Sequence, residues 1–348
     1  MQVKEVADKV WKYFLEQGNF KNTSKIPFGS TGFSLDAKSP QVVLYSVAYT
    51  VGVPKPKIYI FCTKKNISKK DQETLRIFVE ENFASQYGFD VSVEVSGNIQ
   101  IDQEKNSNGT VFVHDDKIAC GSSCAPGTQN YSGTFGAIVK KDGDEENCYI
   151  VSNNHILSAC NDMPPGMPIL SPSNMDTRPG FAAGEIATLS DIIALKSGNV
   201  GFVNPCKEDI ALAKITGVKQ ITSWQGDSSN GYDTPIDIVD CQSYMRVKKF
   251  GRTTGLTHGT ILCKNVPTQI SFNMLSLGYA WFSDFYIVQG DDGFGFSSPG
   301  DSGSLVVTED GRSAVGLIFA GDEYFTFIFP FSHLAQLFGG IKLVNNYG

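Results

Sequence analysis

The chain has 348 residues, which is enough for about two domains and for a full hydrophobic core in at least one of them. Its 35 glycines and many Val, Ile, Thr, Phe and Tyr residues favour β structure with many turns. The net charge of −7, without a basic stripe, argues against nucleic acid or an anionic membrane as a partner. No apolar run approaches the ~20 residues that span a bilayer.

The N-terminal region begins with a predicted amphipathic helix. Six apolar residues fall on one helical face, and charged residues interrupt them: Val3, Val6, Ala7, Val10, Trp11 and Phe14. This pattern is typical of a helix packed on a protein core and not of a signal peptide, so we expect a cytoplasmic protein. A turn-rich link is expected over residues 22–40.

A small α/β domain is predicted to follow that link. Residues 42–49, 57–62 and 91–95 are expected to be strands. Ser68 is a predicted N-cap, with Asp71 as its capping partner, for a helix through about Phe83. Its apolar face contains Leu75, Phe78, Val79 and Phe83. We assign residues 1–108 to this domain, which ends at a polar link near 102–109, and expect a regulatory or partner-binding role.

Only four histidines are available as a general base. Residues 149–151 form a β-type apolar run, small polar residues end it, and His155 follows at once. A histidine at a strand end that faces a cleft suits general-base chemistry near neutral pH. His114 is expected in a solvated turn, His258 in a hairpin loop and His333 at the start of a C-terminal helix over 331–338, so His155 is the best candidate.

Two aspartates compete to orient that histidine. Both stand in the form Asp-Ile-x-x: Asp191 runs into a loop, whereas Asp209 opens an apolar strand that continues through Ile215. A carboxylate at a strand start can be partly buried beside an imidazole and fix its tautomer. We therefore favour Asp209.

The segment Gly300-Asp301-Ser302-Gly303-Ser304, between Pro299 and an apolar run, is the most informative part of the chain. Its glycines permit positive φ and leave room for a substrate. Such a turn can present one hydroxyl while neighbouring backbone N–H groups point into one concavity. Acyl transfer needs this combination of a nucleophile and anion-stabilising donors, so Ser302 is the predicted nucleophile.

Other chemistries lack their motifs. The sequence contains no phosphate-binding loop, no His-Glu-x-x-His zinc motif and no Cys-x-x-Cys pair, so we expect no metal and no organic cofactor. The eight cysteines permit disulfides, and Cys148 and Cys160 flank His155. Free and mostly buried thiols are the favoured state in a chain without a visible export signal.

The order His155, Asp209, Ser302 resembles that of the trypsin/chymotrypsin-like serine peptidases. Residues 152–157 resemble the bacterial branch of that superfamily. Three further segments agree with it: 133–139 as a first barrel strand, 248–261 as a Gly-Arg-Thr-Thr-Gly hairpin, and 315–321 as the strand that lines the substrate channel. The resemblance covers roughly residues 109–348. It implies a mainly β fold, a double six-stranded antiparallel β-barrel preceded by the small α/β domain, with the 331–338 helix closing the second barrel.

The resemblance also implies roles for single residues. The backbone N–H groups of Gly300 and Ser302 would form the oxyanion hole, and Asp301 would shape the turn. Phe296 would lie at the base of the primary specificity pocket, and Phe319, Ala320 and Gly321 would line its entrance. This favours a small or apolar side chain in the substrate, a preference that the nearby acidic residues Asp291, Asp292, Asp322 and Glu323 could reverse.

The predicted function is that of a serine endopeptidase acting on protein or peptide substrates. In digestive relatives, cleavage frees an amine that pairs with the aspartate before the serine, and no such cleavage sequence is obvious here. Activity is therefore either constitutive or controlled by the N-terminal domain or a protein partner bound to it. Two alternatives remain: a partner-activated protease subunit of a bacterial stress or defence assembly, and a catalytically silent protease-like scaffold.

Overall fold

The computed structural model describes residues 2–17, 31–33, 42–63, 67–97, 109–177, 179, 182–198, 204–217, 220–266, 268–271, 277–293 and 295–348. Strands dominate these residues. One long sheet and one curled sheet account for most strands, and a four-stranded sheet and one hairpin account for the others. None of the described helices is long and apolar enough to cross a membrane.

The N-terminal region contains two helices on a small sheet. Its elements are α1 (Val3–Gln17), β1 (Thr31–Phe33), β2 (Val42–Tyr49), β3 (Lys57–Thr63), α2 (Lys69–Val79), a π-helical turn (Glu80–Ala84), a 3-10 turn (Ser85–Tyr87) and β4 (Asp90–Ser96). The predicted helices and strands are confirmed, including the capping box of Ser68 and Asp71. Strand β1 lies inside the predicted 22–40 link and pairs with β2, so that part of the prediction is wrong. The other residues of that link are outside the described residues.

The first barrel is a curled antiparallel sheet in the order β25-β9-β10-β13-β12-β11-β7-β8. Its strands are β7 (Ser123–Pro126), β8 (Gly133–Thr134), β9 (Ala137–Lys141), β10 (Asp144–Ser152), β11 (Pro168–Ser171), β12 (Gly184–Ile192), β13 (Ala211–Ile215) and β25 (Ile341–Leu343). The predicted strand over 133–139 is two strands in the structure. Gly136 interrupts them where a side chain would meet the Gly303 carbonyl oxygen, which leaves no room for a Cβ.

The second barrel is closed, because β17 pairs both with β22 and with β18. Its antiparallel strands are β17 (Arg246–Gly251), β18 (Gly255–Asn265), β21 (Tyr286–Gly290), β22 (Leu305–Thr308), β23 (Ser313–Gly321) and β24 (Phe325–Pro330). The expected hairpin over 248–261 is confirmed as β17 and β18. The mainly β class and the double-barrel architecture are thus as predicted.

Shorter elements complete the fold: α3 (Asn154–Leu157), α4 (Phe331–Leu334), 3-10 turns at Asn174–Asp176, Asp291–Gly293 and Leu337–Gly339, and strands β5 (Val113–His114), β6 (Lys117–Cys120), β14 (Ile221–Gln225), β15 (Tyr232–Asp233), β16 (Asp237–Ile238), β19 (Thr268–Ser271) and β20 (Tyr279–Phe282). The C-terminal helix predicted over 331–338 is wrong in length. It ends at Leu334, and Phe338, Gly339 and Gly340 then adopt positive φ before the chain enters β25 of the first barrel.

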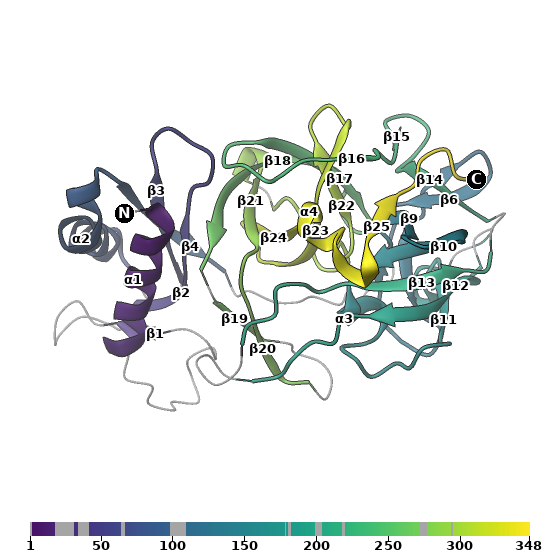
Figure 1. Cartoon of the computed structure of the whole chain (residues 1–348), viewed down its shortest axis with the longest axis horizontal. Coiled ribbons are helices and arrows are strands. Elements are labelled where there is room, and N and C mark those ends of the chain that lie inside the picture. Colours follow the sequence, from purple (N-terminus) through teal and green to yellow (C-terminus); the bar gives the residue numbers. More distant parts are fainter. Residues whose placement is uncertain are drawn as a thin grey trace.

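The second barrel separates the N-terminal helices from the first barrel along the molecule (Figure 1). Strand β18 is long enough to pair with β21 and, through Lys264 and Asn265, with β2. The N-terminal sheet therefore continues the sheet of the second barrel. The assignment of 1–108 and 109–348 to separate domains stays a prediction, and its boundary near 102–108 lies outside the described residues.

Candidate active site

The predicted base and its orienting acid are in direct contact. His155 lies in α3, immediately after β10 ends, and Asp209 lies just before β13, which pairs with β10. The Asp209 carboxylate accepts from His155 Nδ1 at 2.5 Å and from the His155 backbone N–H at 3.2 Å. Both side chains are 0% exposed. This pair fixes both the position and the tautomer of the imidazole.

Neighbouring asparagines hold the two strand ends together. The Asn153 side chain donates to the Asp209 carbonyl oxygen at 2.7 Å, and the Asn154 side chain donates to the Ile193 carbonyl oxygen at 2.8 Å. Asn161 closes the loop after α3 by accepting from Asn154 and from the Leu195 backbone N–H. The only sequence signal for Asn153 and Asn154 is their position directly before the histidine.

The other three histidines lie elsewhere. His114 is in strand β5 and stacks on Trp224, with ring centroids 4.0 Å apart. His258 is in strand β18 opposite Lys248, with Nδ1 2.7 Å from Glu309, so the predicted hairpin loop is wrong at this residue. His333 is in α4, where its Nε2 is 2.9 Å from Glu208.

The predicted nucleophile lies in the turn that leads into β22. The Ser302 hydroxyl donates to the Phe319 carbonyl oxygen at 3.3 Å, and the residue is 5% exposed. Gly300 and Gly303 adopt φ of +96° and +94°. A Cβ on Gly303 would lie 2.1 Å from both the Ser152 hydroxyl and the Thr134 carbonyl oxygen, so this turn requires glycine there.

Thr134 connects this turn to the strand that leads to His155. Its backbone N–H donates to the Ser302 carbonyl oxygen at 2.9 Å, and its hydroxyl donates to the Gly300 carbonyl oxygen at 2.8 Å. Its own carbonyl oxygen accepts from the Ser152 hydroxyl at 2.6 Å, three residues before His155. Thr134 had no functional signal in the sequence, because its partners are distant in the chain.

The backbone N–H groups of the turn divide into two sets. Those of Asp301, Gly303 and Ser304 donate to carbonyl oxygens of the protein. For the N–H groups of Gly300 and Ser302, the described part of the chain provides no acceptor. Their role as the donors of an oxyanion hole stays a prediction.

The four residues predicted to bind substrate are mostly buried. Phe296 belongs to the same buried cluster as Val247 and Val315, and the Phe319 ring stacks on Phe329 with centroids 4.2 Å apart. Ala320 is also buried, and Gly321 is partly exposed at the end of β23. Their role in specificity stays a prediction.

Of the nearby acidic residues, Asp322 accepts hydrogen bonds from the Tyr324 and Phe325 N–H groups, and Asp291 forms an ion pair with Arg246.

All eight cysteines are unpaired, and seven are buried. Burial raises the pKa of the Cys160 thiol, which lies near Asp209, and the Asp209 charge raises it further. A protonated buried thiol is a poor nucleophile. Among the described residues, no group of three His, Cys, Asp or Glu side chains could hold a metal ion.

Comparisons with known proteins give a partial family match and several similar folds. A family model described as the Nal1 C-terminal domain matches residues 198–325. No curated protein matches the chain. Thermobifida fusca protease A is a similar solved structure, at 18% identity and a TM-score of 0.43, covering 66% of this chain and all of that one. A Nocardiopsis protease is similar at 16% identity and a TM-score of 0.45, covering 65% of this chain and 98% of that one. A chymotrypsin of Cellulomonas bogoriensis is similar at 16% identity and a TM-score of 0.43, covering 66% of this chain and 98% of that one.

Proposed function

We propose that this protein is a serine endopeptidase that uses Ser302, His155 and Asp209. The observation that carries the proposal is the buried contact of His155 Nδ1 with Asp209. A fully buried carboxylate held against one imidazole nitrogen prepares the other nitrogen to take a proton. The free N–H groups of Gly300 and Ser302 support the same assignment.

In the proposed mechanism, the Ser302 oxygen attacks the peptide carbonyl carbon while His155 Nε2 takes the hydroxyl proton. The negative charge that develops on the carbonyl oxygen is stabilised by the Gly300 and Ser302 N–H groups. His155 then returns the proton to the leaving amine, which gives an acyl-enzyme and a shorter peptide. Water hydrolyses the acyl-enzyme through the same base, and Asp209 stabilises the imidazolium in both halves of the reaction.

A second candidate is a latent form of the same enzyme that a partner activates. The observation that favours it is the low exposure of the site: His155 is 0% exposed and Ser302 is 5% exposed. A peptide that reaches Ser302 must displace the side chains that cover it. A protein partner acting through the N-terminal region, in a bacterial stress or defence assembly, could supply that displacement.

We also propose that the protein belongs to the bacterial branch of the trypsin-like peptidases and that it is located in the cytoplasm. The unpaired cysteines support a reducing compartment, since such compartments keep thiols reduced. We expect all eight thiols to be alkylated when the protein is unfolded without added reductant. A disulfide-bonded pair in that measurement would remove the support.

A fluorophosphonate probe tests the function. We expect the purified chain to gain one phosphonyl group at Ser302, located by peptide mapping, and Ser302→Ala to gain none. Labelling of the folded chain only after a cell extract is added would favour the partner-activated form. A folded protein that is never labelled would contradict the enzyme assignment and favour the silent scaffold.

A further inference from the structure

The loop between β23 and β24, residues 322–324, is closed by the side chain of its first residue. Strand β23 ends at Gly321, and β24 begins at Phe325. Asp322 Oδ1 accepts from the Tyr324 N–H at 2.7 Å and from the Phe325 N–H at 2.8 Å, and the Asp322 N–H donates to the Phe325 carbonyl oxygen at 2.8 Å. The second carboxylate oxygen, Oδ2, takes no part in this turn.

The N-terminal sheet bonds to that second oxygen. The Ser96 hydroxyl, at the end of β4, donates to Asp322 Oδ2, and Ser96 is 0% exposed. The next residue also reaches the loop, because a Cβ on Gly97 would lie 3.0 Å from Glu323 Cγ. Two successive residues at the end of β4 therefore contact the β23–β24 loop, although 226 positions separate Ser96 from Asp322 in the chain.

The Asp322 carboxylate depends on these neutral donors. Among the described residues, no ion pair includes Asp322. Burial raises the pKa of this carboxyl and the Glu323 charge adds to the shift, while the bonds from Ser96 and the two loop N–H groups oppose it. On β2, burial and the Asp322 charge also raise the pKa of the Tyr45 hydroxyl. A partly buried carboxylate without a cation is costly unless hydrogen bonds satisfy it, and Ser96 supplies a donor from outside the loop.

Strand β23 joins this anchored loop to the candidate site. The Phe319 carbonyl oxygen, which accepts from the Ser302 hydroxyl at 3.3 Å, is only three residues before Asp322. The backbone between them includes Ala320 and Gly321, paired with β24. Residues 319–321 are the stretch that the sequence predicts to line the substrate channel. The loop anchor is therefore continuous with that stretch.

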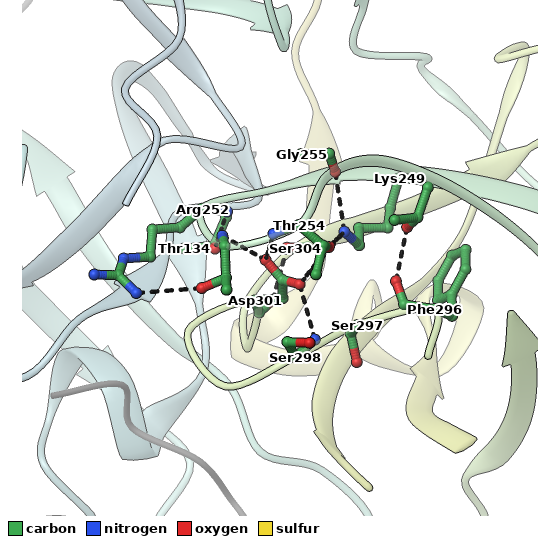
Figure 2. Close-up of polar contacts among 12 residues, drawn as sticks. Thr134, Lys249, Arg252, Thr254, Gly255, Phe296, Ser297, Ser298, Asp301 and Ser304 are labelled. Atoms are coloured by element: carbon green, nitrogen blue, oxygen red, sulfur yellow. Dashed lines mark hydrogen bonds and ion pairs between the residues drawn. The ribbon is translucent and has the colours of Figure 1, made fainter. Parts of the chain in front are cut away.

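The other side of the loop borders the segment before the nucleophile. Figure 2 shows Phe296, Ser297 and Ser298 beside the turn that contains Asp301. The Ser297 hydroxyl lies 2.7 Å from the hydroxyl of Thr326, the second residue of β24, and the Ser298 N–H donates to Asp301 Oδ2 at 3.0 Å. The β23–β24 loop thus lies between the N-terminal sheet and the two segments that border Ser302.

We propose that Asp322 is a positioning residue for this site and that Ser96 holds it. Through this contact the N-terminal sheet fixes residues 319–321 in the arrangement that a bound peptide needs. The inference rests on the proposed function for its effect on peptide binding. Its structural part, that Ser96 orders the β23–β24 loop, stands independently.

Hydrogen exchange tests the structural part in the full-length chain. Ser96→Ala removes the hydroxyl and leaves the loop sequence intact. Ser46→Ala is the matched control, since Ser46 is a buried serine of the same sheet whose hydroxyl donates to the neighbouring Val47 carbonyl oxygen. We expect the Tyr324 and Phe325 N–H groups to exchange about tenfold faster in Ser96→Ala, the scale of one lost hydrogen bond to a charged group. The control should match wild type.

Two phosphonate probes of different size test the effect on the site. A small alkyl fluorophosphonate reports on Ser302 alone, whereas a diphenyl phosphonate carrying an acetyl-Ala-Ala-Ala chain must also lie along residues 319–321. In Ser96→Ala the rate with the peptidyl probe should fall about tenfold, and the rate with the small probe should change by less than about twofold. Asp322→Ala should behave like Ser96→Ala. Asp322→Asn should keep most of the peptidyl rate, because an amide oxygen still accepts from the loop N–H groups.

Each outcome has a distinct meaning. Equal exchange and an equal ratio of the two rates in wild type, Ser96→Ala and Ser46→Ala would overturn the inference. Equal slowing with both probes in Ser96→Ala would also overturn it, because a general structural defect affects both alike. Faster exchange with an unchanged ratio would remove the effect on the channel. A folded wild type that reacts with neither probe would contradict the proposed function, and faster exchange in Ser96→Ala would then still support the structural part.

Discussion

At the scale of single residues, the choice between Asp209 and Asp191 depends on their positions relative to β13. Asp209 lies two residues before the first residue of the strand and contacts His155. Asp191 lies within β12 and forms an ion pair with Lys141 at 3.0 Å. In the sequence, both aspartates are followed by isoleucine. In the structure, β12 pairs antiparallel with β13, and the two carboxylates contact different side chains.

The first prediction uses that difference. Asp209→Asn should keep the fold but lower the rate of Ser302 labelling by roughly 10⁴-fold, because the imidazole loses its tautomer control and its countercharge. Asp191→Asn is the matched control and should change the rate by no more than about twofold, since the partner of Asp191 is Lys141 and not His155. Similar rates in the two variants would show that Asp209 does not orient the base.

At the scale of elements, the turn between β17 and β18 connects several parts of the chain. Arg252 in this turn pairs with Asp176, which follows β11 of the first barrel and also accepts from the Gly109 N–H at 2.8 Å. Thr253 and Thr254 bind Asp301 on the other side. The hairpin therefore links the two barrels directly beside the candidate site.

The second prediction concerns acid stability. Burial raises the pKa of Asp176, but Arg252 and the Gly109 N–H outweigh it and lower the value to about 2. Because the folded pKa lies below that of the unfolded chain, this stabilisation is complete above about pH 4 and is lost as the pH falls through 2. Between pH 5 and 2, wild type should lose roughly 2 kcal/mol more unfolding free energy than Asp176→Asn. Chemical denaturation at several pH values measures this, and parallel losses in the two proteins would contradict it.

At the scale of the whole molecule, the N-terminal sheet is both a continuation of the second barrel and part of its core. Phe61 of β3 contacts Phe325 of β24 edge-to-face, with ring centroids 5.2 Å apart. Tyr45 and Ala48 of β2 belong to the same buried cluster. The other face of this sheet is covered by α1 and α2. Strands covered on both faces explain the nearly continuous apolar runs of β2 and β3.

The third prediction follows from this shared core. A chain of residues 109–348 should unfold at a lower temperature than the full chain and self-associate, because its β18 edge and the apolar side chains around Phe325 become exposed. Thermal unfolding and sedimentation measure both effects. A monomeric 109–348 chain with an unchanged midpoint and unchanged labelling would show that the N-terminal region is an independent domain without a regulatory role.

Much of the fold could be predicted because its signals are local. The apolar face of α1, the capping box at Ser68 and the hairpin over 248–261 each need only neighbouring residues. The adjacent lysines of β17, Lys248 and Lys249, also carry a local signal. Side chains alternate between faces in a strand, so one of Lys248 and Lys249 had to point inward.

The sequence by itself determined the candidate catalytic residues: one histidine at a strand end, a glycine-flanked serine and two aspartates, all in a strand-rich chain. Tertiary structure alone decided that Asp209 meets His155, that Thr134 joins the nucleophile turn to β10, and that Lys249 faces Asp301. The reason is that each of these contacts joins residues far apart in the chain. Strand register and barrel closure bring them together, and neither can be derived from local propensity.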